Sequence, residues 1–217
     1  TQKIGSHSFQ QVVGFRNLEE LKSKLNWFSY RVTKKEALDL PEKTYVTREV
    51  YVTEEQAKHY KAIKDVAMTI LEDEVIIWSR FVYDIERIER ELKHLYGNQS
   101  TVTYYGKTSN EDRQKAIKSF QENDEVQFFV ANPQTAGYGL TLTSASNVIY
   151  YANDFNLETR MQSEDRCHRI GQTNPVLYVD LVTKGTVDVH IVKVLQKKIN
   201  LSAKTLGEQA REWLTLT

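Results

Sequence analysis

Residues 75–105 read VIIWSRFVYDIERIERELKHLYGNQSTVTYY, and this stretch indicates the fold class most clearly. Val75–Trp78 is a continuous apolar run, which predicts a buried strand. The next residues predict a helix, because apolar side chains recur at helical spacing, at Ile85, Ile88, Leu92 and Leu95. Thr101–Tyr105 is rich in β-branched and aromatic residues and predicts a second strand. A strand, a helix and a strand in this order form a β-α-β unit whose strands run parallel.

The same alternation continues towards the C-terminus. Further strands are expected at residues 126–130, 148–151 and 176–182, and helices at residues 109–120, from about 156, and at 187–199. The sequence therefore predicts an α/β fold with a parallel sheet and helices on both faces. Ligands of such folds lie beyond the carboxyl ends of the strands, and we expect every polar motif described below to lie there.

The first 70 residues have a different pattern. A helix at residues 18–25, a basic turn at 31–35, a strand at 44–52 and a helix from the capping box at 53–56 to about residue 71 are expected there. We therefore divide the chain into a small helical and strand unit (1–70), an α/β unit (71–200) and a tail (201–217).

Composition excludes several classes of protein. The chain has 217 residues, 40% of them hydrophobic and 27% charged, which is ordinary for a soluble globular protein. No run approaches the roughly 20 apolar residues of a membrane span, and the N-terminus has no apolar signal region, so a cytoplasmic or nuclear protein without membrane contact is expected. The single cysteine fits a reducing compartment. The formal net charge is zero, so a nucleic-acid site must be a local patch.

Residues 162–172, QSEDRCHRIGQ, contain the most informative polar pattern. Gln162, Arg166 and Arg169 are spaced i, i+4 and i+7, which places them on one face of a helix. Two guanidiniums one turn apart repel each other unless an anion lies between or beyond them, so this face is suited to a polyphosphate. A solvated polar face stays open as the alternative. Gly171 suits a left-handed C′ position that ends the helix.

The segment 131–142 follows the strand at 126–130 and contains two glycines one residue apart. Gly137 and Gly139 allow a ligand to approach the backbone closely, while Gln134 and Thr135 supply short polar contacts. A glycine-containing turn is the simpler interpretation of such a pair. Because the loop leaves the carboxyl end of a strand, one β-α unit before the arginines, we favour a ligand-binding loop.

Other elements of a nucleotide site are missing from the sequence. Gly106-Lys107-Thr108 has the ending of a phosphate-binding P-loop, but Thr101 stands where the motif requires glycine. No acidic box for Mg²⁺ is present, and the histidines lack metal-ligand spacing. Cys167 is either a thiol with a lowered pKa or, as we favour, a structural cysteine. The chain thus has half of an ATPase site.

With these motifs in order, the chain resembles the second RecA-like lobe of the Swi/Snf group within the superfamily-two helicase-like ATPases, over most of residues 12–200. Residues 162–172 are similar to motif VI of that family, whose usual form is Asp-Arg-x-His-Arg-Ile-Gly-Gln. Residues 135–142 are similar to motif V and residues 75–81 to motif IV. Two departures stand out: Thr141 replaces the usual Asn, and Phe155-Asn156-Leu157 replaces the usual aromatic-Asn-Pro.

The resemblance implies a role for each matching residue. Arg166 and Arg169 would be arginine fingers for ATP, which is held together with Mg mainly by a first RecA-like lobe, and Gln162 would couple that site to motif V. Gly137 and Gly139 would line the cleft. The residues implied to contact the phosphodiester backbone of double-stranded DNA are Ser79, Arg80, Gly106, Lys107, Gln134 and Thr135.

The resemblance also implies how the chain would work. Residues 1–70 would connect to the first lobe, which we expect to lie outside this chain, so the chain alone should be inactive. Closure of the two lobes on ATP would move the intact protein along DNA. Two alternatives remain: a non-catalytic adaptor that binds DNA or protein, and an unrelated nucleotide-binding α/β enzyme. The second is disfavoured because no glycine-rich loop follows the first strand.

Overall fold

The computed structural model describes residues 2–4, 7–9, 16–30, 32–50, 74–136 and 139–206 of the 217. Four expected features therefore lie outside the described residues. They are the capping box at 53–56, the helix that follows it, Gly137 and the end of the tail from residue 207.

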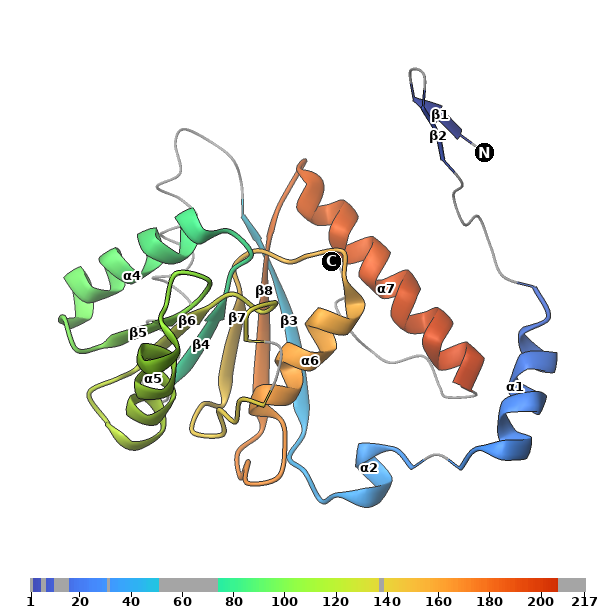
Figure 1. Ribbon diagram of the computed structural model, residues 1–217, viewed down its shortest axis with the longest axis horizontal. Coiled ribbons are helices and arrows are strands. Elements are labelled where there is room, and N and C mark those ends of the chain that lie inside the picture. The colour runs from blue at the N-terminus through green and yellow to red at the C-terminus, as the bar shows by residue number, and fades with distance from the viewer. Residues whose placement is uncertain are drawn as a thin grey trace.

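The centre of the molecule is a six-stranded, entirely parallel sheet (Figure 1). Its strands are β3 (Lys43–Val50), β4 (Val75–Trp78), β5 (Thr101–Tyr104), β6 (Phe128–Ala131), β7 (Asn147–Tyr150) and β8 (Val176–Thr183), in the spatial order β3-β8-β7-β4-β6-β5. Every residue of β4, β6 and β7 is buried, which explains why β4 and β6 are continuous apolar runs and why β7 is apolar after Asn147. The predicted RecA-like α/β fold is confirmed.

Helices cover both faces of this sheet, as predicted (Figure 1). α4 (Val82–Tyr96) packs on one face through Ile85, Ile88 and Leu92. The opposite face is covered by α5 (Asn110–Glu122), α6 (Leu157–Cys167) and α7 (Val187–Leu206). The Ser109 hydroxyl accepts a hydrogen bond from the Asp112 amide and caps α5, as its sequence position predicted.

The N-terminal part differs from the prediction in three ways. A short antiparallel pair, β1 (Gln2–Ile4) and β2 (His7–Phe9), was not expected. α1 (Leu18–Phe28) lies where a helix was predicted, but the expected basic turn is the short helix α2 (Lys34–Ala37). Thr33 and Glu36 form a capping box at the N-terminus of this helix.

The strand predicted for the N-terminal unit belongs to the main sheet. β3 pairs with β8 along its whole length, from Lys43 opposite Val176 to Val50 opposite Thr183. The division of the chain at about residue 70 stays a prediction. Among the described residues, no helix is long and apolar enough to span a lipid bilayer.

Candidate functional site

The predicted site residues lie at two opposite edges of the sheet. α6 follows β7 and runs antiparallel to the strands, so it starts at the carboxyl edge and ends at the amino edge, about 16 Å away for a helix of this length (Figure 1). Arg166 and Arg169 are at the end of α6 and therefore lie at the amino edge. The prediction that every polar motif lies at the carboxyl edge is wrong for these arginines.

The arginine pair has a different local geometry from the predicted one. α6 ends at Cys167 with His168 as its C-cap, so Arg169 lies in the turn that follows and not on the helical face of Arg166. Gly171 does have a positive φ of 102°, but it lies in this turn and not at C′ of the helix. Burial, and then the charge of Arg169, lower the pKa of Arg166 below its ordinary value.

We call residues 166–171, which contain Arg166 and Arg169, the arginine turn. Two hydrogen bonds connect it to the loop after β6. The Arg169 guanidinium donates to the Leu140 carbonyl at 3.0 Å, and the Leu142 amide donates to the Arg166 carbonyl at 2.9 Å. Both bonds use backbone groups of residues 140–142. The Gln162 side-chain amide donates to Glu158, one turn earlier on α6, and its predicted coupling role stays a prediction.

A buried network of charges, which the sequence analysis did not identify, fixes α6 to the sheet. Arg160 is on the inner face of α6 and forms ion pairs with Glu164, at 3.0 Å, and with Asp180 of β8 through two nitrogens. Lys43 of β3 reaches the other oxygen of Glu164 at 3.0 Å, and Tyr45 donates to the same oxygen at 2.8 Å. We call Arg160, Glu164, Asp180 and Lys43 the buried charge network.

Each charge in this network is compensated by its neighbours. Burial alone would raise the pKa of Glu164, but the charges of Arg160 and Lys43 and the hydrogen bond from Tyr45 hold it below its ordinary value. The Arg160 guanidinium also lies 3.3 Å from the ring centroid of Tyr150. α6 contributes only Leu157, Met161 and Cys167 to the apolar clusters, so these charges add to the contacts that hold the helix and its C-terminal arginines on the sheet.

A second group of polar residues meets at the carboxyl edge, from the loops after β4, β6 and β7. Arg80 forms an ion pair with Asp154 at 3.2 Å, and the Gln134 side-chain amide donates to the other Asp154 oxygen at 2.9 Å. The Asn132 side chain donates to the Arg80 carbonyl at 2.8 Å and accepts from the amides of Gln134 and Thr135. We call Arg80, Asn132, Gln134 and Asp154 the edge ring. The sequence analysis predicted Arg80, Gln134 and Thr135 as site residues, but missed Asn132 and Asp154.

The other predicted DNA contacts differ in their exposure to solvent. Ser79 is completely buried and its hydroxyl donates to Asp84 at 3.4 Å, so its side chain does not face a ligand and that prediction is corrected. Lys107 is exposed after β5 and pairs with Glu86 of α4 at 2.7 Å. Gly106 precedes it, with open space where a side chain would begin.

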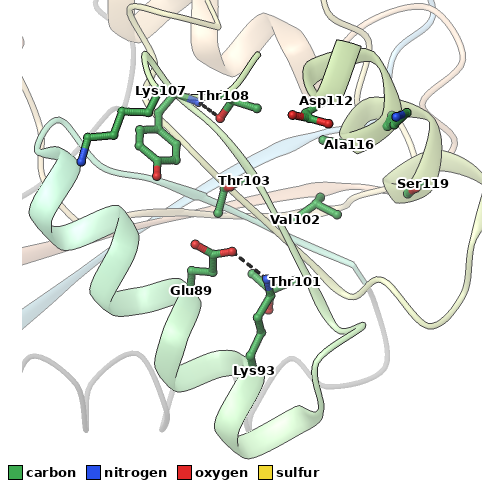
Figure 2. Close-up of a pocket in the computed structure, with 12 residues that line it drawn as sticks. Glu89, Lys93, Thr101, Val102, Thr103, Lys107, Thr108, Asp112, Ala116 and Ser119 are labelled. Atoms are coloured by element: carbon green, nitrogen blue, oxygen red, sulfur yellow. Dashed lines mark hydrogen bonds and ion pairs between the residues drawn. The ribbon is translucent and has the colours of Figure 1, made fainter. Parts of the chain in front are cut away.

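Lys107 borders a cavity of about 450 Å³ beside the edge strand β5 (Figure 2). The cavity lies between α4 and α5, and its polar lining includes Thr101, Thr103 and Ser119. Figure 2 shows the Lys107 side chain extending towards α4 and away from Asp112 of α5. Neither the arginine turn nor the edge ring lines this cavity.

The glycine loop is described only in part. Gly139 has a φ of 79°, in the region that favours glycine, and no atom lies within 4 Å of the place where a Cβ would be. A side chain at this position would thus be strained by the backbone and not by crowding. The expected role of Gly139 in a ligand cleft stays a prediction.

Cys167 is the structural cysteine that the sequence analysis favoured. It is fully buried, its thiol donates to the Ala145 carbonyl, and burial raises its pKa to about 12. We therefore expect no alkylation of Cys167 by iodoacetamide at pH 8 in the folded chain and complete alkylation in denaturant, as measured by mass spectrometry. Rapid alkylation of the folded chain would contradict this assignment.

No group of three or more His, Cys, Asp or Glu side chains that could hold a metal ion occurs among the described residues. The arginine turn offers cationic donors, which match a phosphate group but not a metal ion. A nucleotide bound at this turn would therefore meet guanidinium groups of this chain, and its Mg²⁺ would need carboxylates from elsewhere.

Comparison with known proteins agrees with the sequence motifs. Residues 58–171, more than half of the chain, match the family model of the helicase conserved C-terminal domain. The chain is 42% identical over 135 residues to Protein CHROMATIN REMODELING 19 of Arabidopsis thaliana, which covers 61% of this chain and 17% of that protein. It is 43% identical over 88 residues to the human lymphoid-specific helicase, which covers 41% of this chain and 10% of that protein.

A solved structure shares the fold. The crystal structure of the C-terminal part of the Fun30 ATPase domain superimposes with a TM-score of 0.59 and 29% sequence identity, over 64% of this chain and 46% of that one. The chain spans less than a fifth of the length of the two relatives described above.

Proposed function

Since the chain belongs to the helicase conserved C-terminal domain family, as the carboxyl-terminal lobe of a Swi/Snf-type protein, we propose that it supplies arginine fingers and DNA-backbone contacts to an ATP-dependent translocase on double-stranded DNA. The ATP, with its Mg²⁺, would be held mainly by a first RecA-like lobe. The name of the Arabidopsis relative refers to chromatin remodelling, which favours a nuclear protein that acts on DNA.

One observation carries this proposal: the segment 132–142 connects the edge ring to the arginine turn. At its start, Asn132 and Gln134 belong to the edge ring, where DNA would bind. At its end, Leu140 and Leu142 are hydrogen-bonded to Arg169 and Arg166, where the γ-phosphate of ATP would lie. A protein that converts ATP hydrolysis into movement needs a physical link of this kind between its two sites.

The arginine turn has the properties that a finger requires. The charge of Arg169 contributes to the lowered pKa of Arg166, and an anion bound between the two guanidiniums would relieve this repulsion. A γ-phosphate gains negative charge on its oxygens during hydrolysis, so two guanidiniums stabilise the transition state more than the bound ATP. The buried charge network would hold them in place without touching the nucleotide.

The residues that would contact the phosphodiester backbone are Arg80, Gly106, Lys107, Gln134 and Thr135. Arg80, with its side chain 43% exposed, and Lys107, 68% exposed, present cations at the carboxyl ends of β4 and β5. Such contacts fix the position of a protein on DNA but carry no sequence information. Ser79 is not included, because it is buried.

The proposal is tested by measuring duplex DNA binding and ATP hydrolysis of the 217-residue chain. We expect salt-dependent binding without DNA-stimulated ATPase activity, because a P-loop and the Mg²⁺ carboxylates are absent from this sequence. Replacing Arg80 by Ala should reduce the slope of log K against log salt by about 0.9. DNA-stimulated hydrolysis by the chain alone, or binding that is independent of salt, would contradict the proposal.

A non-catalytic adaptor remains the second candidate function. The observation in its favour is that Arg80 and Lys107 are already paired with carboxylates, so the surface carries both positive and negative charges. An adaptor has no use for two arginines that face a phosphate, so it predicts that replacing both Arg166 and Arg169 leaves the intact protein fully functional.

A further inference from the structure

The edge ring contains a carboxylate at a place where the proposed DNA contact predicts positive charge. Asp154 lies in the loop after β7, between Arg80 from the loop after β4 and Gln134 from the loop after β6. A negative side chain next to a phosphodiester backbone is repelled by it, so the residue requires an explanation from its own contacts.

Those contacts use both oxygens of the carboxylate. Oδ1 accepts from Arg80 at 3.2 Å and from the backbone amide of Phe155 at 2.6 Å, and Oδ2 accepts from the Gln134 side chain at 2.9 Å. The Asp154 side chain is 14% exposed, whereas that of Arg80 is 43% exposed. The carboxylate thus lies beneath the two side chains that it holds, and the guanidinium is the outer group.

The loop after β6 is fixed to the same two neighbours. Asn132 donates to the Arg80 carbonyl and accepts from the backbone amides of Gln134 and Thr135, which sets the shape of the turn that carries Gln134. The main chain of Arg80 is therefore held by Asn132 and its side chain by Asp154. Three loops that are far apart in sequence are thus joined by hydrogen bonds at one place.

We propose that Asp154 is a positioning residue for the DNA-backbone site: it holds the Arg80 guanidinium and the Gln134 amide side by side at the carboxyl edge of the sheet. The inference rests on the proposed function, because it assigns DNA-backbone contact to Arg80 and Gln134. A guanidinium has five N–H donors, so a carboxylate on one side leaves donors for a phosphate on another. Fixing a long side chain before binding lowers the entropy that binding must overcome.

The two physical effects of Asp154 have opposite signs, which makes the inference testable. If the charge only repelled DNA, removing it would strengthen binding. If the carboxylate positions its partners, removing it releases Arg80 and Gln134 and weakens binding. The Asp154 charge is already compensated by the Arg80 guanidinium at 3.2 Å, so its net repulsion of DNA should be small and we expect positioning to dominate.

The test is the affinity of the full chain for a short DNA duplex, measured by fluorescence anisotropy at several salt concentrations. Asp154→Asn keeps the size of the side chain and should weaken binding by about five- to tenfold, a typical coupling between residues in contact. The thermal midpoint of each variant is measured alongside. Asp124→Asn is the matched control, since it removes the same charge from an exposed residue before β6, at the opposite edge, and should leave the affinity unchanged.

A second background separates positioning from a merely structural role. In a chain with Arg80→Ala and Gln134→Ala, Asp154 no longer holds either DNA-contacting side chain, so Asp154→Asn should have no further effect on DNA affinity. Tighter binding by the single Asp154→Asn variant, or an equal loss in both backgrounds, would overturn the inference while leaving the DNA site intact. If Arg80→Ala with Gln134→Ala binds like the unaltered chain, the proposed DNA contact itself fails, and the inference fails with it.

Discussion

Replacing Arg169 by Ala in the intact protein is expected to reduce ATP hydrolysis by about 10³- to 10⁵-fold while ATP binding is largely retained. The guanidinium would act on charge that develops on the γ-phosphate only during hydrolysis, so its loss raises the barrier without weakening the ground-state complex. The measurements are the DNA-stimulated hydrolysis rate and the dissociation constant of a fluorescent ATP analogue.

Arg169 also donates to the Leu140 carbonyl, so a control must separate the finger role from the support of that loop. Leu140→Ala keeps the carbonyl and the arginine and alters only the apolar side chain, and it should retain most of the hydrolysis rate. Arg166→Ala should reproduce the loss in rate, because both guanidiniums would face the same phosphate. Loss of ATP binding in the Arg169 variant, or hydrolysis within tenfold of normal, would contradict the finger role.

Replacing Arg160 by Met is expected to lower the free energy of unfolding by about 3–5 kcal/mol, the usual cost of removing one partner from a buried ion pair. Met preserves most of the volume but leaves Asp180 and Glu164, whose side chains are both 0% exposed, without their shared cation. Urea denaturation of the full chain, followed by far-ultraviolet circular dichroism, measures the effect.

The matched control removes a cation from an exposed pair. Lys107→Met breaks the ion pair with Glu86, in which both side chains are exposed to solvent, and should change the stability by less than about 1 kcal/mol. A double variant, Arg160→Met with Asp180→Asn, should be less destabilised than the sum of its parts, since the uncompensated charge is removed. Equal effects of Arg160→Met and Lys107→Met would contradict the role of the buried charge network.

The loss of stability caused by Arg160→Met should depend on pH, because the buried charge network contains Glu164. The pKa of Glu164 is lower in the folded chain than its ordinary value of 4.5, so its ion pair stabilises the fold above that pH and the stabilisation is lost as the pH falls through the folded pKa. The difference in stability between the unaltered chain and Arg160→Met should therefore narrow as the pH is lowered below about 4.5. The denaturation series is repeated at pH 7, 5 and 3.5.

The central strands β4 and β6 were predictable from sequence because their burial is uniform. β4 coincides with the predicted residues 75–78, since a central parallel strand is buried on both faces and reads as one apolar run. The end of α6 was not predictable in the same way. Residues 162–169 keep a helical spacing, but tertiary bonds end the helix at Cys167: the His168 ring contacts the Pro41 carbonyl, and Gln172 donates to the Ala145 carbonyl.

The partners within the candidate site were hidden for a similar reason. Arg160 and Glu164 are one turn apart, a spacing that usually indicates a solvated pair, and their burial depends on Asp180 and Lys43, which lie far away in the sequence. The sequence did contain one indication of this burial: Asp180 is the single acidic residue inside the apolar run 176–182. Asp154 had no such signal, because an aspartate in a loop is ordinary until the neighbouring loops are placed beside it.

The position of the two polar groups at opposite edges of the sheet has a consequence for genetics. The edge ring and the arginine turn consist of different side chains, and both the segment 132–142 and helix α6 lead from one edge of the sheet to the other. On the proposed function, substitutions in the two groups are separation-of-function alleles. Those at Arg80 or Asp154 weaken DNA binding and leave the residues that act on ATP unchanged, whereas those at Arg166 or Arg169 block ATP hydrolysis and leave DNA binding unchanged. A substitution within the segment 132–142 would weaken the coupling between the two sites.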